Sequence, residues 1–249
     1  MAVKEKDFVE VEYTGKVRED NIIFDTTDEK TAKDNDIYSK DMPYGPVAVC
    51  VGTNTLLKGL EDSLIGKEPG SYTVELKPEN AFGKKDAKLL KIVSTNIFRK
   101  ANIDPAPGLQ VNIDGALGTI KNVTGGRTIV DFNHPISGKD VVYDVKINRI
   151  LTDRAEKVKA YVSLQFNLKP ESFDVKIDEK DVAGIKFKQG IKLSHFNTGM
   201  MKEALMDLVG LSDVVFVETS PEKMKAAEQN VAAAKAKGSE RNESEPTQK

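Results

Sequence analysis

The sequence predicts an α+β fold: an antiparallel sheet wrapped on one short helix, interrupted by an inserted all-β module and followed by a C-terminal α+β domain. Apolar residues alternate with polar ones in several segments, which is typical of half-buried strands, whereas helical spacing is confined to a few segments. The pattern also changes twice along the chain. With 249 residues, the chain is long enough for one to three domains with real cores.

The first domain is predicted from strands that share this alternation. Residues 9–13 carry their apolar side chains on one face, and we expect this strand to end at Thr14-Gly15. The same period returns at 47–51, 72–76 and 141–147. Between two of these strands, leucines recur at helical spacing and Gly66 ends the run, which predicts one short helix with an apolar stripe.

A small all-β module is predicted over residues 89–132, where short strands and tight turns replace the longer alternation. Asp114-Gly115 and Gly125-Gly126 are strong signals for two-residue hairpin turns. The module is expected to interrupt the first domain, because the strand at 141–151 has no other obvious sheet to join.

A third domain is predicted after Leu151. Its expected elements are, in order, an amphipathic helix near 158–165, strands at 173–177 and 185–193, a helix from Thr198 to Gly210 and a strand at 214–217. Ser220-Pro221 is expected to start a last helix that runs to Lys237. The predicted boundaries are 1–85 and 132–153 for the discontinuous first domain, 86–131 for the insert, 154–237 for the C-terminal domain and 238–249 for a disordered tail.

Composition and charge exclude several classes of function. Lys and Arg total 37 against 39 Asp and Glu, and the net charge of -2 gives no field that would steer nucleic acid. A secretion signal and a membrane span of ~20 apolar residues are both absent, so we expect a cytoplasmic protein without a membrane partner. The single cysteine, Cys50, fits a small buried hydrophobe in a reducing compartment.

No metal or cofactor site is predicted. The two histidines, His134 and His195, lie far apart with no cysteine at ligand spacing, and we interpret both as structural. The remaining candidates for a functional site are aromatic and aliphatic residues, together with one carboxylate, at the ends of strands and helices. Their spacing alone indicates only a hydrophobic core. These residues are Tyr13, Phe24, Asp25, Leu56, Leu57, Leu60, Phe82 and Tyr143.

Several short segments, read in order, resemble FKBP-type prolyl isomerases. They are Val11-Glu12-Tyr13-Thr14-Gly15, Phe24-Asp25-Thr26-Thr27, Val51-Gly52, Leu56-Leu57-Lys58-Gly59-Leu60-Glu61 and Pro78-Glu79-Asn80-Ala81-Phe82-Gly83. The segment from Asp131 to Lys139 resembles the one that closes the inserted domain in the SlyD-like branch. The whole arrangement resembles the long archaeal form of that branch, strongly over residues 1–153 and mainly by position and length beyond them.

This resemblance implies a peptidyl-prolyl cis-trans isomerase that needs no cofactor and acts on unfolded or nascent polypeptides with X-Pro bonds. The eight residues above would line an apolar pocket for the proline ring, and the backbone amide of Leu57 would donate to a substrate carbonyl. Asp25 would orient groups of the pocket or interact with the twisted amide; the alternative is a turn cap after its strand. The insert, an insert-in-flap domain, would hold clients or use the same residues as its own core: Ile97, Phe98, Ile103, Leu109 and Val123.

Two departures from the family pattern leave other hypotheses open. Phe82 stands where the family usually has tyrosine, so a hydroxyl that could bond to the substrate is missing. The histidine- and cysteine-rich tail of bacterial SlyD proteins is absent, so no metal role is carried over. One alternative is therefore a non-enzymatic holding chaperone or scaffold with a weakened pocket. Another is an oligomerisation protein that forms a homodimer through the C-terminal domain, based on its aliphatic helix and on Met200 and Met201.

Overall fold

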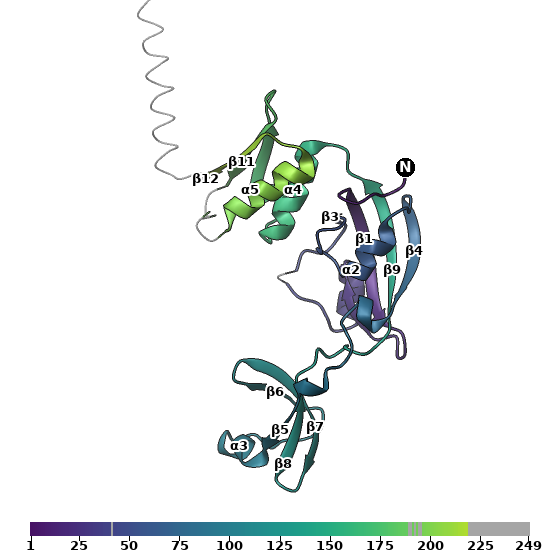
Figure 1. The fold of residues 1–249 in the computed structure, drawn as a ribbon, viewed down its shortest axis with the longest axis vertical. Coiled ribbons are helices and arrows are strands. Elements are labelled where there is room, and N and C mark those ends of the chain that lie inside the picture. The colour runs from purple at the N-terminus through teal and green to yellow at the C-terminus, as the bar shows by residue number, and fades with distance from the viewer. Residues whose placement is uncertain (41, 189–190, 192, 194–195, 219–249) are drawn as a thin grey trace, which may run out of the picture. The chain divides into compact units, whose positions relative to one another are not determined.

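The computed structural model describes residues 1–40, 42–188, 191, 193 and 196–218 (Figure 1). The chain forms two compact units. The first contains residues 1–47 and 51–150, and the second contains residues 48–50, which are most of β3 (Val47–Cys50), and the chain from Leu151. Within the described residues, no helix combines the length and apolar character needed to cross a membrane.

The main sheet of the first unit is built around β1 (Phe8–Val17). This strand pairs antiparallel with β2 (Ile23–Thr26) and β9 (Val141–Ile150), and β9 pairs with β4 (Gly70–Leu76), in the order β2-β1-β9-β4. The predicted end of the first strand at Thr14-Gly15 is wrong. Gly15 pairs with Asp25 on one side and Tyr143 on the other, and β1 continues for two more residues.

Two short helices belong to the first unit. The predicted helix is α2 (Lys58–Leu64), which buries Leu60 and Leu64 and starts one residue after Leu57, its N-cap. A second helix, α1 (Glu29–Asp34), was not expected from the sequence. Its N-cap Asp28 accepts a hydrogen bond from the Thr31 amide at 2.7 Å, which stabilises the first turn.

The insert forms a sheet of its own in the order β5-β8-β7-β6. The two predicted hairpin turns are confirmed, because Asp114-Gly115 joins β6 to β7 and Gly125-Gly126 joins β7 to β8 with all four residues at positive φ. A short helix, α3 (Thr95–Lys100), is added to the expected strands, and the 3-10 turn η2 (Ala87–Leu89) precedes them. The strands are β5 (Leu90–Ser94), β6 (Gln110–Ile113), β7 (Ala116–Thr124) and β8 (Arg127–Asp131).

The second unit has a three-stranded sheet in the order β10-β11-β12, antiparallel in the first pair and parallel in the second. The predicted helix end at Gly210 is confirmed, since this glycine caps α5 in the left-handed conformation. His195, the expected last helix and the expected tail lie outside the described residues. The elements are α4 (Arg154–Gln165), η3 (Pro170–Ser172), β10 (Phe173–Ile177), β11 (Val182–Phe187), α5 (Thr198–Val209) and β12 (Asp213–Glu218).

Candidate active site

Four of the candidate residues form one aromatic cluster, which comprises Tyr13, Phe24, Phe82 and Tyr143. The ring of Tyr143 on β9 lies 5.9 Å from that of Tyr13 on β1 and 5.8 Å from that of Phe24 on β2, centroid to centroid. Phe24 in turn meets Phe82 edge to face at 5.4 Å. Such edge-to-face pairs add to the stability that area burial alone gives. Tyr143 is buried, whereas the other three rings are half-buried.

Gly15 makes room for this cluster near the end of β1. A Cβ atom there would lie 2.7 Å from Cε1 of Tyr143 and 3.0 Å from Cζ of Phe24, closer than side chains pack. The rings therefore occupy the space that any other residue at position 15 would fill. An isolated glycine inside a strand pattern is a signal of such close approach, and the sequence interpretation treated Gly15 only as a strand end.

Asp25 is joined to the aromatic cluster through the Tyr13 hydroxyl, which donates a hydrogen bond to its carboxylate. Burial raises the pKa of Asp25 above its ordinary value, although the bonds from Tyr13 and from the Thr26 backbone act in the opposite direction. The pKa of Tyr13 is raised by burial first and by the nearby Asp25 charge second. Asp25 itself lies within β2, opposite Gly15, and the N-cap of α1 is Asp28.

The turn that carries Phe82 is held close to α2. It follows η1 (Pro78–Asn80), and a Cβ atom on Gly59 in α2 would collide with the backbone oxygen of Asn80. The Gly83 amide also donates to the Pro78 carbonyl at 2.7 Å. Gly59 thus lets the turn approach the helix, which places Phe82 near the helix that carries Leu60.

The start of α2 is organised by the buried carboxylate of Glu61, which is 1% exposed. Its two oxygens accept hydrogen bonds from the amides of Gly52 at 2.9 Å, Asn54 at 3.1 Å and Leu56 at 2.7 Å. Leu56 and Leu57 are half-buried on this ordered loop, and Leu60 is fully buried. Within the part of the chain that the structure describes, the Leu57 amide has no acceptor and is available to a ligand.

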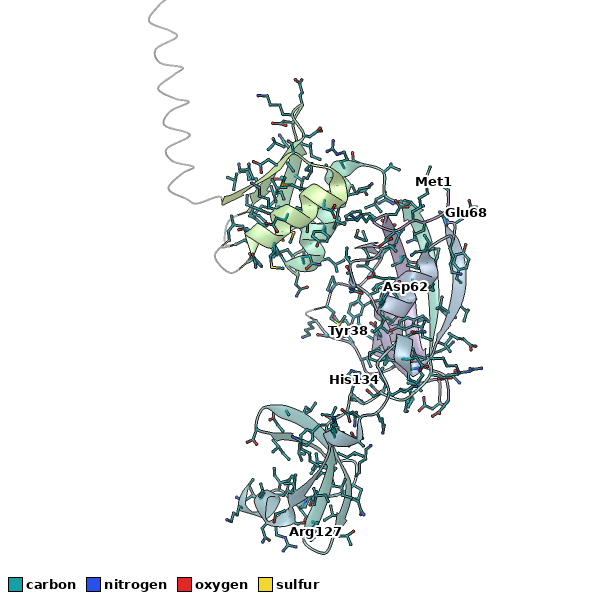
Figure 2. All side chains as sticks on the ribbon, viewed as in Figure 1. Met1, Tyr38, Asp62, Glu68, Arg127 and His134 are labelled. Carbon is teal, nitrogen blue, oxygen red and sulfur yellow. The ribbon has the colours of Figure 1, made fainter. Side chains whose placement is uncertain are left out.

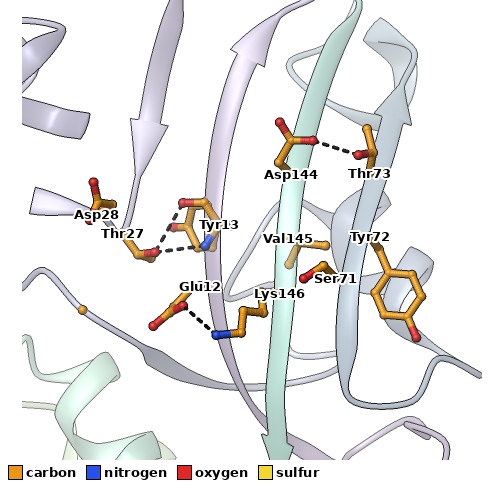
Figure 3. Close-up of a pocket in the computed structure, with 11 residues that line it drawn as sticks. Glu12, Tyr13, Thr27, Asp28, Ser71, Tyr72, Thr73, Asp144, Val145 and Lys146 are labelled. Carbon is orange, nitrogen blue, oxygen red and sulfur yellow. Dashed lines mark hydrogen bonds and ion pairs between the residues drawn. The ribbon is translucent and has the colours of Figure 1, made fainter. Parts of the chain in front are cut away.

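A separate hollow of about 420 Å³ lies over β1, β9 and β4 (Figure 3). Each of its charged groups has a partner: Glu12 pairs with Lys146 at 3.7 Å, Asp144 accepts from the Thr73 hydroxyl at 2.8 Å and pairs with Lys16, and Asp28 caps α1. Of the eight candidate residues, only Tyr13 lines this hollow. Charged side chains at its rim are costly to desolvate against a proline ring, and the hollow lies apart from the aromatic cluster except at Tyr13.

The candidate client-binding residues of the insert differ in exposure. Phe98 is 2% exposed and packs in the core with Val111, Ile120 and Val130, which favours the core interpretation for this residue. Val123 is partly buried against the same core. The remaining candidates lie on the surface and are Ile97, Ile103 and Leu109, at 55%, 37% and 38% exposure.

Sequence reasoning missed three residues that shape the site. Gly15 and Glu61 are described above, and the third is His134, whose ring stacks on Phe82. No sequence pattern links Glu61 to its backbone partners, which lie five to nine residues earlier. The histidine is separated from Phe82 by the whole insert. Within the described residues, no group of three or more His, Cys, Asp or Glu side chains is arranged as a metal site requires.

Comparisons with known proteins identify the family. A family model described as FKBP-type peptidyl-prolyl cis-trans isomerase matches residues 1–99, and one described as FKBP26, IF domain, matches residues 91–136. The chain is similar to the short-type peptidyl-prolyl cis-trans isomerase of Methanocaldococcus jannaschii, with 32% identity over 155 residues, which cover 62% of this chain and 98% of that protein.

Two bacterial proteins are similar over a smaller part. The FKBP-type 16 kDa peptidyl-prolyl cis-trans isomerase of Escherichia coli is 33% identical over 111 residues, covering 42% of this chain and 74% of that protein. The SlyD isomerase of Vibrio cholerae is 27% identical over 134 residues, covering 52% and 66%. With nearly the whole of the Methanocaldococcus jannaschii isomerase matched at this identity, the chain belongs to the FKBP-type peptidyl-prolyl cis-trans isomerases.

Proposed function

We propose that the protein isomerises X-Pro bonds of unfolded polypeptides by packing the proline ring against the aromatic cluster. The observation that carries this proposal is the cluster itself, in which four rings are linked edge to face beside a half-buried carboxylate, two of them packed against Gly15. The reaction is a rotation about one C–N bond, so it requires no nucleophile and no proton transfer.

The energetic demand on such a site is modest. The uncatalysed rotation faces a barrier of about 18–20 kcal/mol, and each tenfold acceleration needs only about 1.4 kcal/mol of preferential binding to the twisted state. A ten-thousandfold acceleration therefore needs about 5–6 kcal/mol. The planar amide is the more polar species, so an apolar surface that excludes water favours the twisted one.

Two polar groups would orient the substrate on this surface. The free amide of Leu57, at the N-cap of α2, can donate to a substrate carbonyl, and the Glu61 carboxylate holds the preceding loop in place. Asp25 would fix the Tyr13 ring through their hydrogen bond and present its charge to the twisted amide. Both groups act by position, because neither has to exchange a proton during the rotation.

Kinetics on a short proline peptide tests the role of the aromatic cluster. We expect Phe24→Ala to lower kcat/KM at least about tenfold, because the ring touches both Tyr143 and Phe82. Ile97→Ala, an exposed residue of the insert, is the matched control and should leave peptide activity unchanged. Equal activity of Phe24→Ala and the unmodified protein would contradict the proposed site.

For the insert, residues 86–131, we propose a holding function for unfolded clients. Several large apolar side chains are exposed on it: Leu90, Ile92, Ile97, Ile103, Leu109 and Leu117. Two of them lie on β5, an edge strand of the insert's sheet, where an extended chain could add by main-chain hydrogen bonds. Such binding tolerates many sequences, as a general folding factor requires.

The alternative of a non-enzymatic chaperone rests on one residue, Phe82. Its ring packs on Phe24 but offers no hydroxyl to a substrate. If the missing hydroxyl limits catalysis, Phe82→Tyr should raise kcat/KM on a proline peptide while leaving the holding of unfolded protein unchanged. Peptide activity equal to that of a tyrosine-bearing relative would exclude this alternative.

For the second unit we propose a homodimer contact. β12 is an edge strand of its sheet, with Val215 and Val217 exposed at 46% and 43%, and Met200 on α5 is exposed at 69%. Sedimentation of the full chain beside Val217→Lys tests this: a dimer that the charge dissociates supports it, and a monomer in both cases excludes it. A cytoplasmic location, consistent with the single buried cysteine, remains a prediction.

A further inference from the structure

The segment that returns from the insert to β9 touches the Phe82 turn at three places. The His134 ring stacks on the Phe82 ring, with centroids 4.8 Å apart and planes 11° from parallel. The Ser137 hydroxyl donates to the Phe82 carbonyl at 2.9 Å. The Gly138 amide donates to the Gly83 carbonyl at 2.8 Å. These contacts join residues more than fifty positions apart in the sequence.

The return segment, His134–Gly138, is itself a closed turn. The Ser137 amide donates to the His134 carbonyl at 2.9 Å, and the Ile136 amide approaches Nδ1 of the His134 ring at 3.4 Å. Ser137 is 5% exposed, so the bond from its hydroxyl to the Phe82 carbonyl is shielded from water. The histidine ring is therefore held on a short, hydrogen-bonded turn, and Figure 2 labels His134.

The stack continues the aromatic cluster. The rings follow one another from His134 to Phe82 at 4.8 Å, from Phe82 to Phe24 at 5.4 Å, and from Phe24 to Tyr143 at 5.8 Å. Phe82 is thus packed between two rings, one from β2 and one from the return segment. It stands on a turn outside the sheet and lacks the hydroxyl that would give it a polar anchor.

We infer that the return segment is a part of the isomerase site, in which His134 and Ser137 are positioning residues that fix the Phe82 ring against the bound proline. This inference rests on the proposed function of the aromatic cluster. The chain is interrupted by the insert just after the Phe82 turn, and the segment that returns from the insert supports the Phe82 ring.

Proline-peptide kinetics on four variants tests the inference. His134→Ala and Ser137→Ala should lower kcat/KM about threefold to tenfold, mainly through KM, because Phe82 loses a stacking partner or a hydrogen bond. His134→Phe keeps a flat ring and should restore most of the activity. Asn133→Ala is the matched control: it removes the bonds to the Asp86 backbone at 2.8 and 3.0 Å and to the Asp131 carboxylate at 2.8 Å, but no ring contact or hydrogen bond with Phe82. It should leave kcat/KM unchanged.

The outcomes separate this inference from the function on which it rests. Loss in His134→Ala, recovery in His134→Phe and an unchanged Tm support the positioning role. Full activity in both His134→Ala and Ser137→Ala, beside a loss in Phe24→Ala, overturns the role of the return segment and leaves the aromatic cluster as the site. Inactivity of the unmodified protein on proline peptides overturns the proposed function and this inference together.

Discussion

Asp25 shows at the scale of a single residue how function and stability can oppose each other. Its carboxylate is half-buried, and burial raises its pKa above the ordinary value of 3.8. As pH rises, the unfolded chain releases this proton before the folded chain does. The ionised group therefore destabilises the fold progressively between the ordinary and the raised pKa, and the full penalty is present above the raised pKa.

Replacing Asp25 by asparagine should remove this penalty. The amide oxygen can still accept from the Tyr13 hydroxyl, so Asp25→Asn is expected to be at least as stable as the unmodified protein at pH 7, with the difference vanishing as pH falls toward 3.8. Its activity on proline peptides should fall, because the charge is lost. Urea unfolding of both proteins between about pH 4 and pH 7 measures the difference in unfolding free energy. A lower stability of Asp25→Asn at pH 7 would contradict the expected penalty.

Gly15 carries the second prediction at this scale. In Gly15→Ala the added methyl group would meet the rings of Tyr143 and Phe24, and overpacking of this kind costs about 1–3 kcal/mol. We expect lower stability and lower peptide activity together. Gly118→Ala is the matched control, since its Cβ would lie 2.6 Å from Val130 within the insert. Gly118→Ala should destabilise the insert and leave peptide activity unchanged. An equal loss of peptide activity in both variants would contradict the assignment of the Tyr143 and Phe24 rings to the active site.

At the scale of elements, the loop before α2 depends on one side chain. Glu61 satisfies three backbone amides, and an amide side chain can offer them only one oxygen. Glu61→Gln should therefore cost about 1–3 kcal/mol of unfolding free energy and raise KM for proline peptides, because the Leu57 amide loses its support. Asp62→Asn breaks only the exposed pair with Lys58 and should change stability by about 0.5 kcal/mol or less. Equal effects of the two variants would contradict this role.

The elements also show what the sequence can and cannot predict. Alternation predicted most strands of both units, because one face of each strand is buried, and the turns Asp114-Gly115 and Gly125-Gly126, at positive φ, marked the hairpins. It missed β2, and the strand expected at 185–193 lies at Val182–Phe187. The extension of β1 past Gly15 was missed, because a glycine usually signals the end of a strand. Here the glycine is needed because the rings of Tyr143 and Phe24, on other strands, pack against it. The stack of His134 on Phe82 was also missed, because no local pattern links residues on either side of an insert. The residues assigned to the active site came from family resemblance, not from spacing.

At the scale of the molecule, we expect two parts of the first unit to have separate roles: the aromatic cluster isomerises and the insert holds clients. Removing residues 86–131 takes away the exposed apolar side chains of the insert but keeps the return segment that supports Phe82. Peptide activity should therefore remain within about threefold of the full chain, whereas activity on an unfolded protein should fall at least about tenfold as clients are no longer held near the site. Loss of peptide activity to the same extent would argue against separate roles.

If the aromatic cluster and the insert together accelerate proline-limited folding, the refolding rate of a model protein with a slow X-Pro step must respond to both. The rate is measured with catalytic amounts of the full chain, of Asp25→Ala and of the chain lacking 86–131. We expect the full chain to accelerate refolding and both variants to lose most of that acceleration. Refolding that is unaffected or only slowed by all three would contradict it and identify a protein that holds clients without isomerising them.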